Sequence, residues 1–242
     1  MIEAAEFIAG QAANRLLLIA DHAANHVPDD VVLGAAPALL DDHIAIDIGV
    51  APLTRALAER LGAAAVLARF SRLVVDLNRD ADEENVIPAR SDGHVILGNA
   101  NLSAAERGAR LARFWYPYHA LIDERIETLQ PALLGSIHSF TPQLASRPEE
   151  ERPWQVGVLY NHDDRAARLA IPLLRERGIV TGDNEPYSGR ALNATMNRHG
   201  EARGLPYLGL EVRQDLIATD HGVALWADRL GPIIGEVAAA LA

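Results

Sequence analysis

The stretch Leu16–His22, LLLIADH, places five apolar residues directly before an acidic residue and a histidine. A short apolar run that ends so abruptly is typical of a buried strand in a parallel sheet. Further strand-like runs follow along the chain, at Ala64–Ala68, Leu73–Leu77, Leu133–His138, Val156–Tyr160 and Tyr207–Val212. The closeness of the second and third runs favours some antiparallel pairing, so we predict a mixed sheet.

Helical patterns alternate with these runs. Residues Ile48–Leu61 place leucines four apart and are followed by Gly62, a common helix terminator. Ser103 and Glu106 form the pattern of a capping box, which predicts a long helix to about Leu129 with a kink at Pro117. Two further helices are predicted, at Asp164–Arg177 and Gly222–Leu241. This alternation predicts an α/β fold around a mixed, mostly parallel sheet, and the absence of a linker predicts a single domain over residues 1–242.

Composition excludes several classes of function. The 242 residues contain 22 basic and 33 acidic side chains, a net charge of −11, which argues against broad nucleic-acid binding. No apolar run approaches the roughly 18 residues of a membrane span, and the segment Met1–Gly10 lacks the basic residue of a secretory signal. We therefore expect a cytoplasmic protein. Without cysteine, a metal ion must be held by His, Asp, Glu or Asn.

Polar side chains follow the predicted strands at their carboxyl ends, where open α/β sheets bind ligands. They are His22 after the first strand, Asn78-Arg79 after the Leu73 run, His138, and Glu211 with Arg213. Two histidines, arginines and a carboxylate at one sheet edge predict a site for a metal ion and an anion. Two polar segments are also predicted to be loops. Asp80–Asn101 is long enough to be functional, and Ser146–Pro153 is a surface excursion.

Structural alternatives exist for each of these residues. His22 would equally cap the following turn, and Glu211 would equally form an ion pair with Arg213 two residues on. His119, beside aromatic residues in the long helix, is more typical of a core, and the roles of His162 and His199 stay open. We expect three other histidines to be solvated, namely His43, His94 and His221. Serine-hydrolase, phosphate-loop and His-Glu-x-x-His motifs are missing, which favours another form of metal-assisted hydrolysis.

Several blocks of the sequence belong together as a set. Three lie in the first third of the chain, at Asp21–Pro28, Asp47–Gly49 and Ser71–Arg79. The later ones are Ile137–Pro142, Gly182–Ser188 and Arg203–Pro206, which leads into Glu211–Leu216. In this order the blocks resemble the N-formylglutamate amidohydrolase family. The resemblance implies a three-layer α/β/α sandwich like that of zinc carboxypeptidases and aspartoacylases. It also implies a zinc enzyme that hydrolyses a small-molecule N-acyl amino acid, typically N-formyl-L-glutamate to formate and L-glutamate.

The resemblance also assigns roles to residues. His22 and His138 match zinc ligands, and Glu211 matches the general base that takes a proton from water. Arg72 matches the residue that polarises the scissile carbonyl, and Asn78-Arg79 match the pair that holds a substrate carboxylate.

This sequence departs from the related His-x-x-Glu pattern, because it has Asn25 in the glutamate position. The third zinc ligand is therefore Asp47, a water molecule or the amide oxygen of Asn25. We prefer Asp47, since two histidines and a carboxylate form a usual zinc set. Tyr187 and Arg213 are further predicted substrate contacts. A deacylase of another N-acyl amino acid and a non-catalytic binding protein remain as alternatives.

Overall fold

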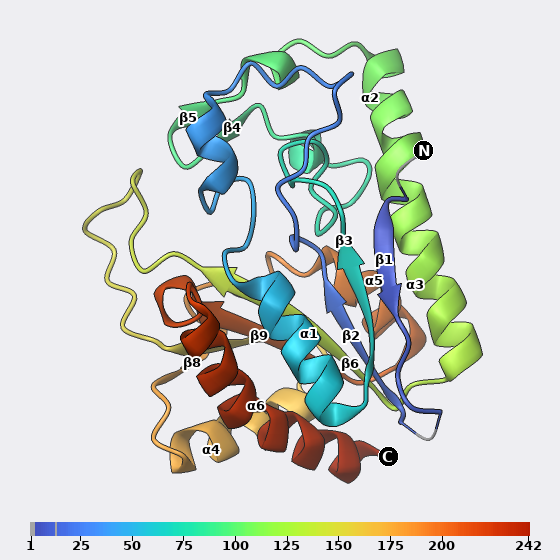
Figure 1. Cartoon of the computed structure of the whole chain (residues 1–242), viewed down its shortest axis with the longest axis vertical. Coiled ribbons are helices and arrows are strands. Elements are labelled where there is room, and N and C mark those ends of the chain that lie inside the picture. The colour runs from blue at the N-terminus through green and yellow to red at the C-terminus, as the bar shows by residue number, and fades with distance from the viewer. Residues whose placement is uncertain (1–2, 13) are drawn as a thin grey trace.

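A computed structural model describes residues 3–12 and 14–242 and contains a seven-stranded sheet (Figure 1). The strand order is β1-β3-β2-β6-β9-β7-β8. In chain order the strands are β1 (Ala5–Ile8), β2 (Leu16–Ala20), β3 (Ala64–Ala68), β6 (Leu133–Phe140), β7 (Val156–Leu159), β8 (Thr181–Asp183) and β9 (Tyr207–Arg213). Strands β3, β2, β6 and β9 are parallel, whereas β1 pairs antiparallel with β3 and β7 pairs antiparallel with β9. The predicted mixed, mostly parallel sheet is confirmed.

The prediction of a strand at Leu73–Leu77 is wrong. This segment is buried but forms turns, and the antiparallel partner of β3 is β1. Its backbone is satisfied locally: the Leu73 N–H donates to Ser71 Oγ at 3.2 Å, and the Asp76 N–H donates to the Val86 carbonyl at 2.7 Å. A buried apolar run needs satisfied hydrogen bonds, but it does not need a sheet ladder to obtain them.

Helices cover both faces of the sheet, as expected for a three-layer sandwich. The helices are α1 (Val50–Leu61), α2 (Ala104–Arg110), α3 (Tyr116–Leu129), α4 (Arg165–Glu176), α5 (Ala194–His199) and α6 (Asp220–Leu241). Helix α6 packs against α1 and α4 on one face, whereas α3 contacts α5 on the other (Figure 1). Helix α1 ends at Gly62, which has a left-handed φ of 63°.

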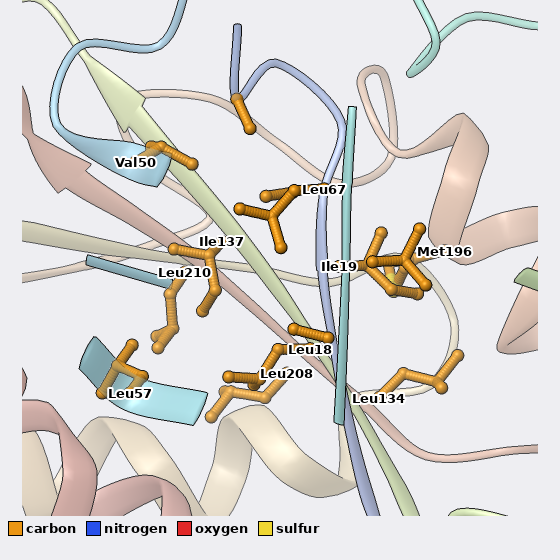
Figure 2. Packing of buried hydrophobic residues seen from close by; sticks show 14 of the residues in the cluster. Leu18, Ile19, Val50, Leu57, Leu67, Leu134, Ile137, Met196, Leu208 and Leu210 are labelled. Carbon is orange, nitrogen blue, oxygen red and sulfur yellow. The ribbon is translucent and has the colours of Figure 1, made fainter. Parts of the chain in front are cut away.

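The core is built by alternation along the central strands. In β2, Leu18 lies beside Leu208 and Ile19 beside Met196 of α5, on opposite faces of the sheet (Figure 2). All five residues of β2 are buried, which explains why its sequence is a continuous apolar run. The rigid central strands therefore fix the positions of the polar residues that follow them.

The predicted capping box is confirmed, because the Ser103 hydroxyl accepts from the Glu106 N–H and the Glu106 carboxylate accepts from the Ser103 N–H. Helices α2 and α3 form one long rod, as predicted, but a π-helical turn at Leu111–Trp115 joins them. In this turn the Tyr116 N–H donates to the Leu111 carbonyl, five residues back. Pro117, which has no N–H to donate, follows directly.

Long loops follow the carboxyl ends of the parallel strands. The Asp80–Asn101 segment carries a small hairpin of β4 (Arg90–Ser91) and β5 (His94–Val95), seen in the upper part of Figure 1. Residues 141–153 follow β6 without regular structure, as predicted for the Ser146–Pro153 part. Both segments are therefore placed to shape a site at this end of the sheet. Across the described residues, no helix is long and apolar enough to cross a membrane.

Candidate functional site

A cavity of about 320 Å³ opens at the carboxyl ends of the parallel strands. Its polar lining comes from seven segments that are far apart in sequence. The principal polar lining residues are His22, His43, Asp47, Arg72, Asn78, Arg79, Asp92, His138, Ser146, Arg147, Tyr187 and Glu211. The sheet edge predicted to bind a ligand is thus the location of a real cavity.

Three buried side chains form the centre of the cavity wall. Asp47 Oδ2 lies 2.8 Å from Nδ1 of His138 and 3.4 Å from Nδ1 of His22. One ligand atom from each of the three residues lies within 4.8 Å of the others. The backbone holds this arrangement, because the Asp47 N–H donates to the His22 carbonyl at 3.0 Å. Two imidazole nitrogens and a carboxylate oxygen converge as they do in metal sites.

Each histidine is held from behind by a second carboxylate. His22 Nε2 lies 2.7 Å from Asp76 Oδ1, and His138 Nε2 lies 3.2 Å from Asp21 Oδ2. Burial disfavours a charged His138, but its hydrogen bonds to Asp21 and Asp47 outweigh this effect and raise its pKa. Carboxylates behind ligating histidines fix the tautomer that leaves the inner nitrogen free for a metal ion.

The charge balance of this cluster fits a divalent cation. Four buried carboxylates, of Asp21, Asp47, Asp76 and Glu211, stand against the single guanidinium of Arg72. With both histidines neutral, as metal ligands are, the cluster carries three excess negative charges, whereas in the metal-free protein the raised pKa values of His22 and His138 favour protons that offset two of them. Buried charges are expensive unless they are compensated. A divalent ion on His22, Asp47 and His138 would supply that compensation, and nitrogen with carboxylate oxygen is a donor set that zinc accepts.

Glu211 has the environment of a proton carrier. It lies opposite His138 in the β6–β9 register, and its carboxyl group is buried. Its Oε2 atom has no hydrogen-bond partner among the described residues. Burial raises the pKa of Glu211 to about 7. An unpaired carboxyl group with this pKa exchanges a proton readily near neutral pH.

Arg72 is fixed by two of the buried acids. Its Nη2 donates to Asp76 Oδ2 at 2.7 Å, and its Nη1 donates to Asp47 Oδ1 at 3.3 Å. The side chain also lines the cavity. It therefore presents a rigid positive charge to whatever the cavity binds.

Asn78 and Arg79 both line the cavity beyond Arg72. Asn78 Oδ1 accepts from the Thr195 N–H at 3.0 Å, so the amide nitrogen of Asn78 remains available as a donor. Among the described residues, the guanidinium of Arg79 has one long contact with an acid, 3.4 Å from Nη1 to Oε2 of Glu83. Both residues can therefore donate to an anionic ligand.

Tyr187 also lines the cavity, and Arg152 holds its hydroxyl group. The Arg152 side chain is fully buried, and its Nη1 donates to the Tyr187 hydroxyl at 2.9 Å. Because Arg152 only donates, the hydroxyl hydrogen of Tyr187 remains free for another acceptor. Tyr187 is thus placed to donate into the cavity that it lines.

Two predicted site residues do not join the cluster. Asn25, the alternative third ligand, donates from Nδ2 to Asp41 Oδ1 at 3.0 Å and does not line the cavity. Arg213 pairs with Asp215 at 2.8 Å, and it neither lines the cavity nor contacts Glu211. The structural alternative for Glu211, an ion pair with Arg213, is therefore wrong.

The other histidines lie in the core, at the surface (His26 among them) or, for His43, in the cavity wall. His119 is buried, as the sequence favoured, and its Nδ1 lies 2.8 Å from Nε2 of the equally buried His199. His94, His162 and His221 are exposed. The expectation that His43 is solvated is wrong, because it lines the cavity and its Nε2 lies 3.1 Å from Asp92.

Several supporting residues were not predicted from the sequence. Asp21 Oδ1 accepts from the Tyr118 hydroxyl at 2.7 Å and from the Thr195 hydroxyl at 3.0 Å, which fixes the carboxylate behind His138. Asp21 and Asp76 both belong to the blocks that carry the family resemblance, so their position was a usable signal. Thr195 carried no such signal, because it lies outside these blocks and contacts Asp21 across 174 residues of sequence.

Comparison with known proteins agrees with the geometry. A family model described as N-formylglutamate amidohydrolase matches residues 14–218. An N-formylglutamate deformylase of Pseudomonas aeruginosa is 35% identical over 96 residues, or 34% of this chain. A protein of the same name from Pseudomonas putida is 28% identical over 160 residues, or 59% of this chain. The matched stretches span 36% and 58% of these relatives.

Two solved structures share the fold over almost the whole chain. A gene product of Agrobacterium tumefaciens is 30% identical with a TM-score of 0.92, covering 98% of this chain and 96% of that one. An N-formylglutamate amidohydrolase from Ralstonia eutropha is 21% identical with a TM-score of 0.71, covering 99% of this chain and 98% of that one. At that identity the second likeness concerns the fold alone.

Proposed function

Because this chain belongs to the N-formylglutamate amidohydrolase family, we propose that its cavity hydrolyses the amide bond of N-formyl-L-glutamate to formate and L-glutamate. The observation that carries the proposal is the unpaired, buried Glu211 carboxyl group, which lines the same cavity as the convergent His22, Asp47 and His138. A proton carrier beside a metal-binding set is what metal-assisted amide hydrolysis requires.

We propose zinc as the cofactor, held by His22, Asp47 and His138. When bound, the ion would polarise the amide carbonyl and acidify the attacking water molecule. Asp76 and Asp21 orient the two histidines from behind. Asp47 is the third ligand in this proposal, because Asn25 is engaged with Asp41 outside the cavity.

Glu211 acts as the general base and then as the general acid. Its carboxylate takes a proton from water as the oxygen attacks the formyl carbon. The same carboxyl group then donates that proton to the departing amine nitrogen of glutamate. Burial raises the pKa of this carboxyl group and so makes its carboxylate a better proton acceptor, as a group that must accept and release a proton within one turnover requires.

The two arginines have different roles in this proposal. Arg72 stabilises the negative charge that develops on the carbonyl oxygen during the reaction, and Arg79 binds a carboxylate that the substrate already carries. Arg72, fixed by Asp47 and Asp76, donates to the carbonyl oxygen as it becomes negative. Asn78 and Arg79 bind a carboxylate of the substrate, for which the planar guanidinium is well shaped. Tyr187 supplies a further hydroxyl donor to the cavity.

The test is formate release from N-formyl-L-glutamate by chelator-stripped protein, with and without one equivalent of zinc. Zinc-dependent release supports the reaction, the metal and the substrate together. Release without zinc would contradict the metal assignment. Stoichiometric zinc binding without release would contradict the substrate and favour another N-acyl amino acid, which a panel of N-formyl and N-acetyl amino acids would identify.

A further inference from the structure

The mouth of the cavity carries an arginine that the proposed reaction does not yet use. Arg147 lies on the irregular segment after β6 and lines the cavity together with Ser146 and Thr141. Its side chain is 57% exposed, so its charge is not consumed in the buried cluster. Arg72, by contrast, is bonded to two buried acids.

The backbone just before Arg147 is held by Asp92, which also lines the cavity. The carboxylate of Asp92, at the tip of the β4–β5 hairpin, accepts from the Ala145 N–H at 2.9 Å and from the Ser146 N–H at 2.8 Å. It also accepts from the Ser146 hydroxyl, and His43 Nε2 lies 3.1 Å away. These contacts fix the residues just before Arg147, and they satisfy the Asp92 carboxylate with donors of the protein.

The acidic partner of Arg147 is shared with a second arginine. Glu150 Oε2 lies 2.6 Å from Arg147 Nη1, while Glu150 Oε1 accepts from Arg152 Nη2 at 2.8 Å. One carboxylate thus serves two guanidinium groups, so the trio has a net charge of 2 − 1 = +1. Arg152 is fully buried and bonded to Glu150 and Tyr187, so it cannot reach a ligand at the surface. The excess positive charge is therefore available to a ligand at the exposed Arg147.

We propose that Arg147 binds a second carboxylate of the substrate and so makes the site selective for N-acyl derivatives of dicarboxylic amino acids. This inference rests on the proposed function. Asn78 and Arg79 hold one carboxylate, and Arg147 binds the other from the cavity mouth. An N-acyl amino acid with one carboxylate leaves Arg147 without a ligand and binds more weakly.

The test measures binding separately from turnover. Calorimetry is done on zinc-loaded protein carrying Glu211→Gln, which slows hydrolysis, with N-formyl-L-glutamate and N-formyl-L-glutamine. These ligands have nearly the same shape and differ by one charge. We expect Arg147→Gln to raise the Kd for the glutamate ligand roughly 10- to 100-fold and to change the Kd for the glutamine ligand less than about twofold. Arg147→Lys keeps the charge without the planar fork and should give an intermediate Kd.

The matched control is Arg90→Gln, which removes an exposed arginine of β4 that does not line the cavity. It should leave both Kd values unchanged. Equal weakening of both ligands by Arg147→Gln, no weakening of the glutamate ligand, or failure of the parent protein to bind either ligand at millimolar concentration would each overturn the inference. Selective binding without formate release by the protein with Glu211 intact would overturn only the proposed hydrolysis.

Discussion

His22 Nε2 lies 2.7 Å from Oδ1 of Asp76, and the same carboxylate accepts from Arg72 at 2.7 Å. The imidazole is thereby held in one orientation before any ligand arrives. Because folding already orders these side chains, a metal ion would meet a preformed set of donors.

Replacing Asp76 should therefore weaken metal binding without removing a ligand. We expect Asp76→Asn to raise the zinc Kd about 10- to 100-fold, because the amide is a poorer partner for the His22 N–H. Competition with a chromogenic chelator measures this change. Asp80→Asn, a nearby acid that contacts neither histidine, is the control, and an unchanged Kd in Asp76→Asn would contradict the role.

Glu211 should contribute to turnover and not to metal retention. We expect Glu211→Gln to lower kcat by about 10²- to 10⁴-fold, because the amide cannot carry the proton. Zinc content, measured by atomic absorption, should stay near one equivalent. His138→Ala should instead lose the metal, and a Glu211→Gln protein without zinc would show that Glu211 is a ligand.

The pH dependence of kcat/KM should follow the Glu211 carboxyl group. Burial raises the pKa of this group to about 7 in the metal-free protein, and a bound cation would lower it by favouring the carboxylate. The base form is lost as pH falls, so kcat/KM of the zinc-loaded enzyme should decline in acid with a midpoint at or below about 7. A rate that is flat down to pH 4.5, near the ordinary value for glutamate, would contradict this assignment.

Acid should also destabilise the fold through the paired histidines. Burial lowers the pKa of His119 to about 3 and that of His199 to about 4. The unfolded chain binds protons at histidine near pH 6.5, so the stability from these neutral residues is present above about 6.5 and lost as pH falls toward 4. Urea unfolding at pH 7 and pH 5 measures the loss. His199→Gln should reduce this pH dependence, whereas replacement of the exposed His162 by Gln should not.

Gly49 should be irreplaceable where α1 begins beside the site. Its φ is 80°, and an added Cβ would lie 2.2 Å from the Ile217 carbonyl oxygen. We expect Gly49→Ala to destabilise the protein by more than about 2 kcal/mol in urea unfolding. Gly93 has a similar φ of 83° with nothing within 4 Å, so Gly93→Ala should cost only about 1 kcal/mol. Equal losses would contradict the steric argument.

The sequence predicted the fully buried strands well, because burial on both faces gives β2 a continuous apolar run and gives β6 an apolar start at Leu133-Leu134. The same signal failed at Leu73–Leu77, since a buried irregular segment is apolar for the same reason. The short strands β1 and β8 and the short helix α5 were missed. Three to six residues are too few to display a period.

For the site, the residue types at strand ends predicted which side chains gather, and His22, Asp47, His138 and Glu211 do line one cavity. Sequence spacing did not predict which of these side chains contact one another. The contact between Asp47 and His138 spans 91 residues. It forms because β2 pairs with β6, which brings the ends of these strands together, and because the Asp47 N–H donates to the carbonyl of His22, just after β2. Arg147 was missed because a loop arginine has no pattern that distinguishes it from ordinary surface charge.

The π-helical turn at Leu111–Trp115 sets the direction in which the side chains of α3 point relative to those of α2. Before it, Arg107 and Arg110 of α2 fasten the Asp80–Asn101 segment through backbone carbonyls and Asn99. After it, Tyr118 of α3 points to Asp21. Each residue of an α-helix advances the direction of the side chains by about 100°. Deleting one residue between Arg110 and Tyr118 would leave α2 and α3 helical, but it would rotate Tyr118 away from Asp21 or the two arginines away from the Asp80–Asn101 segment. The number of residues in this helical rod is therefore itself a structural requirement of the site.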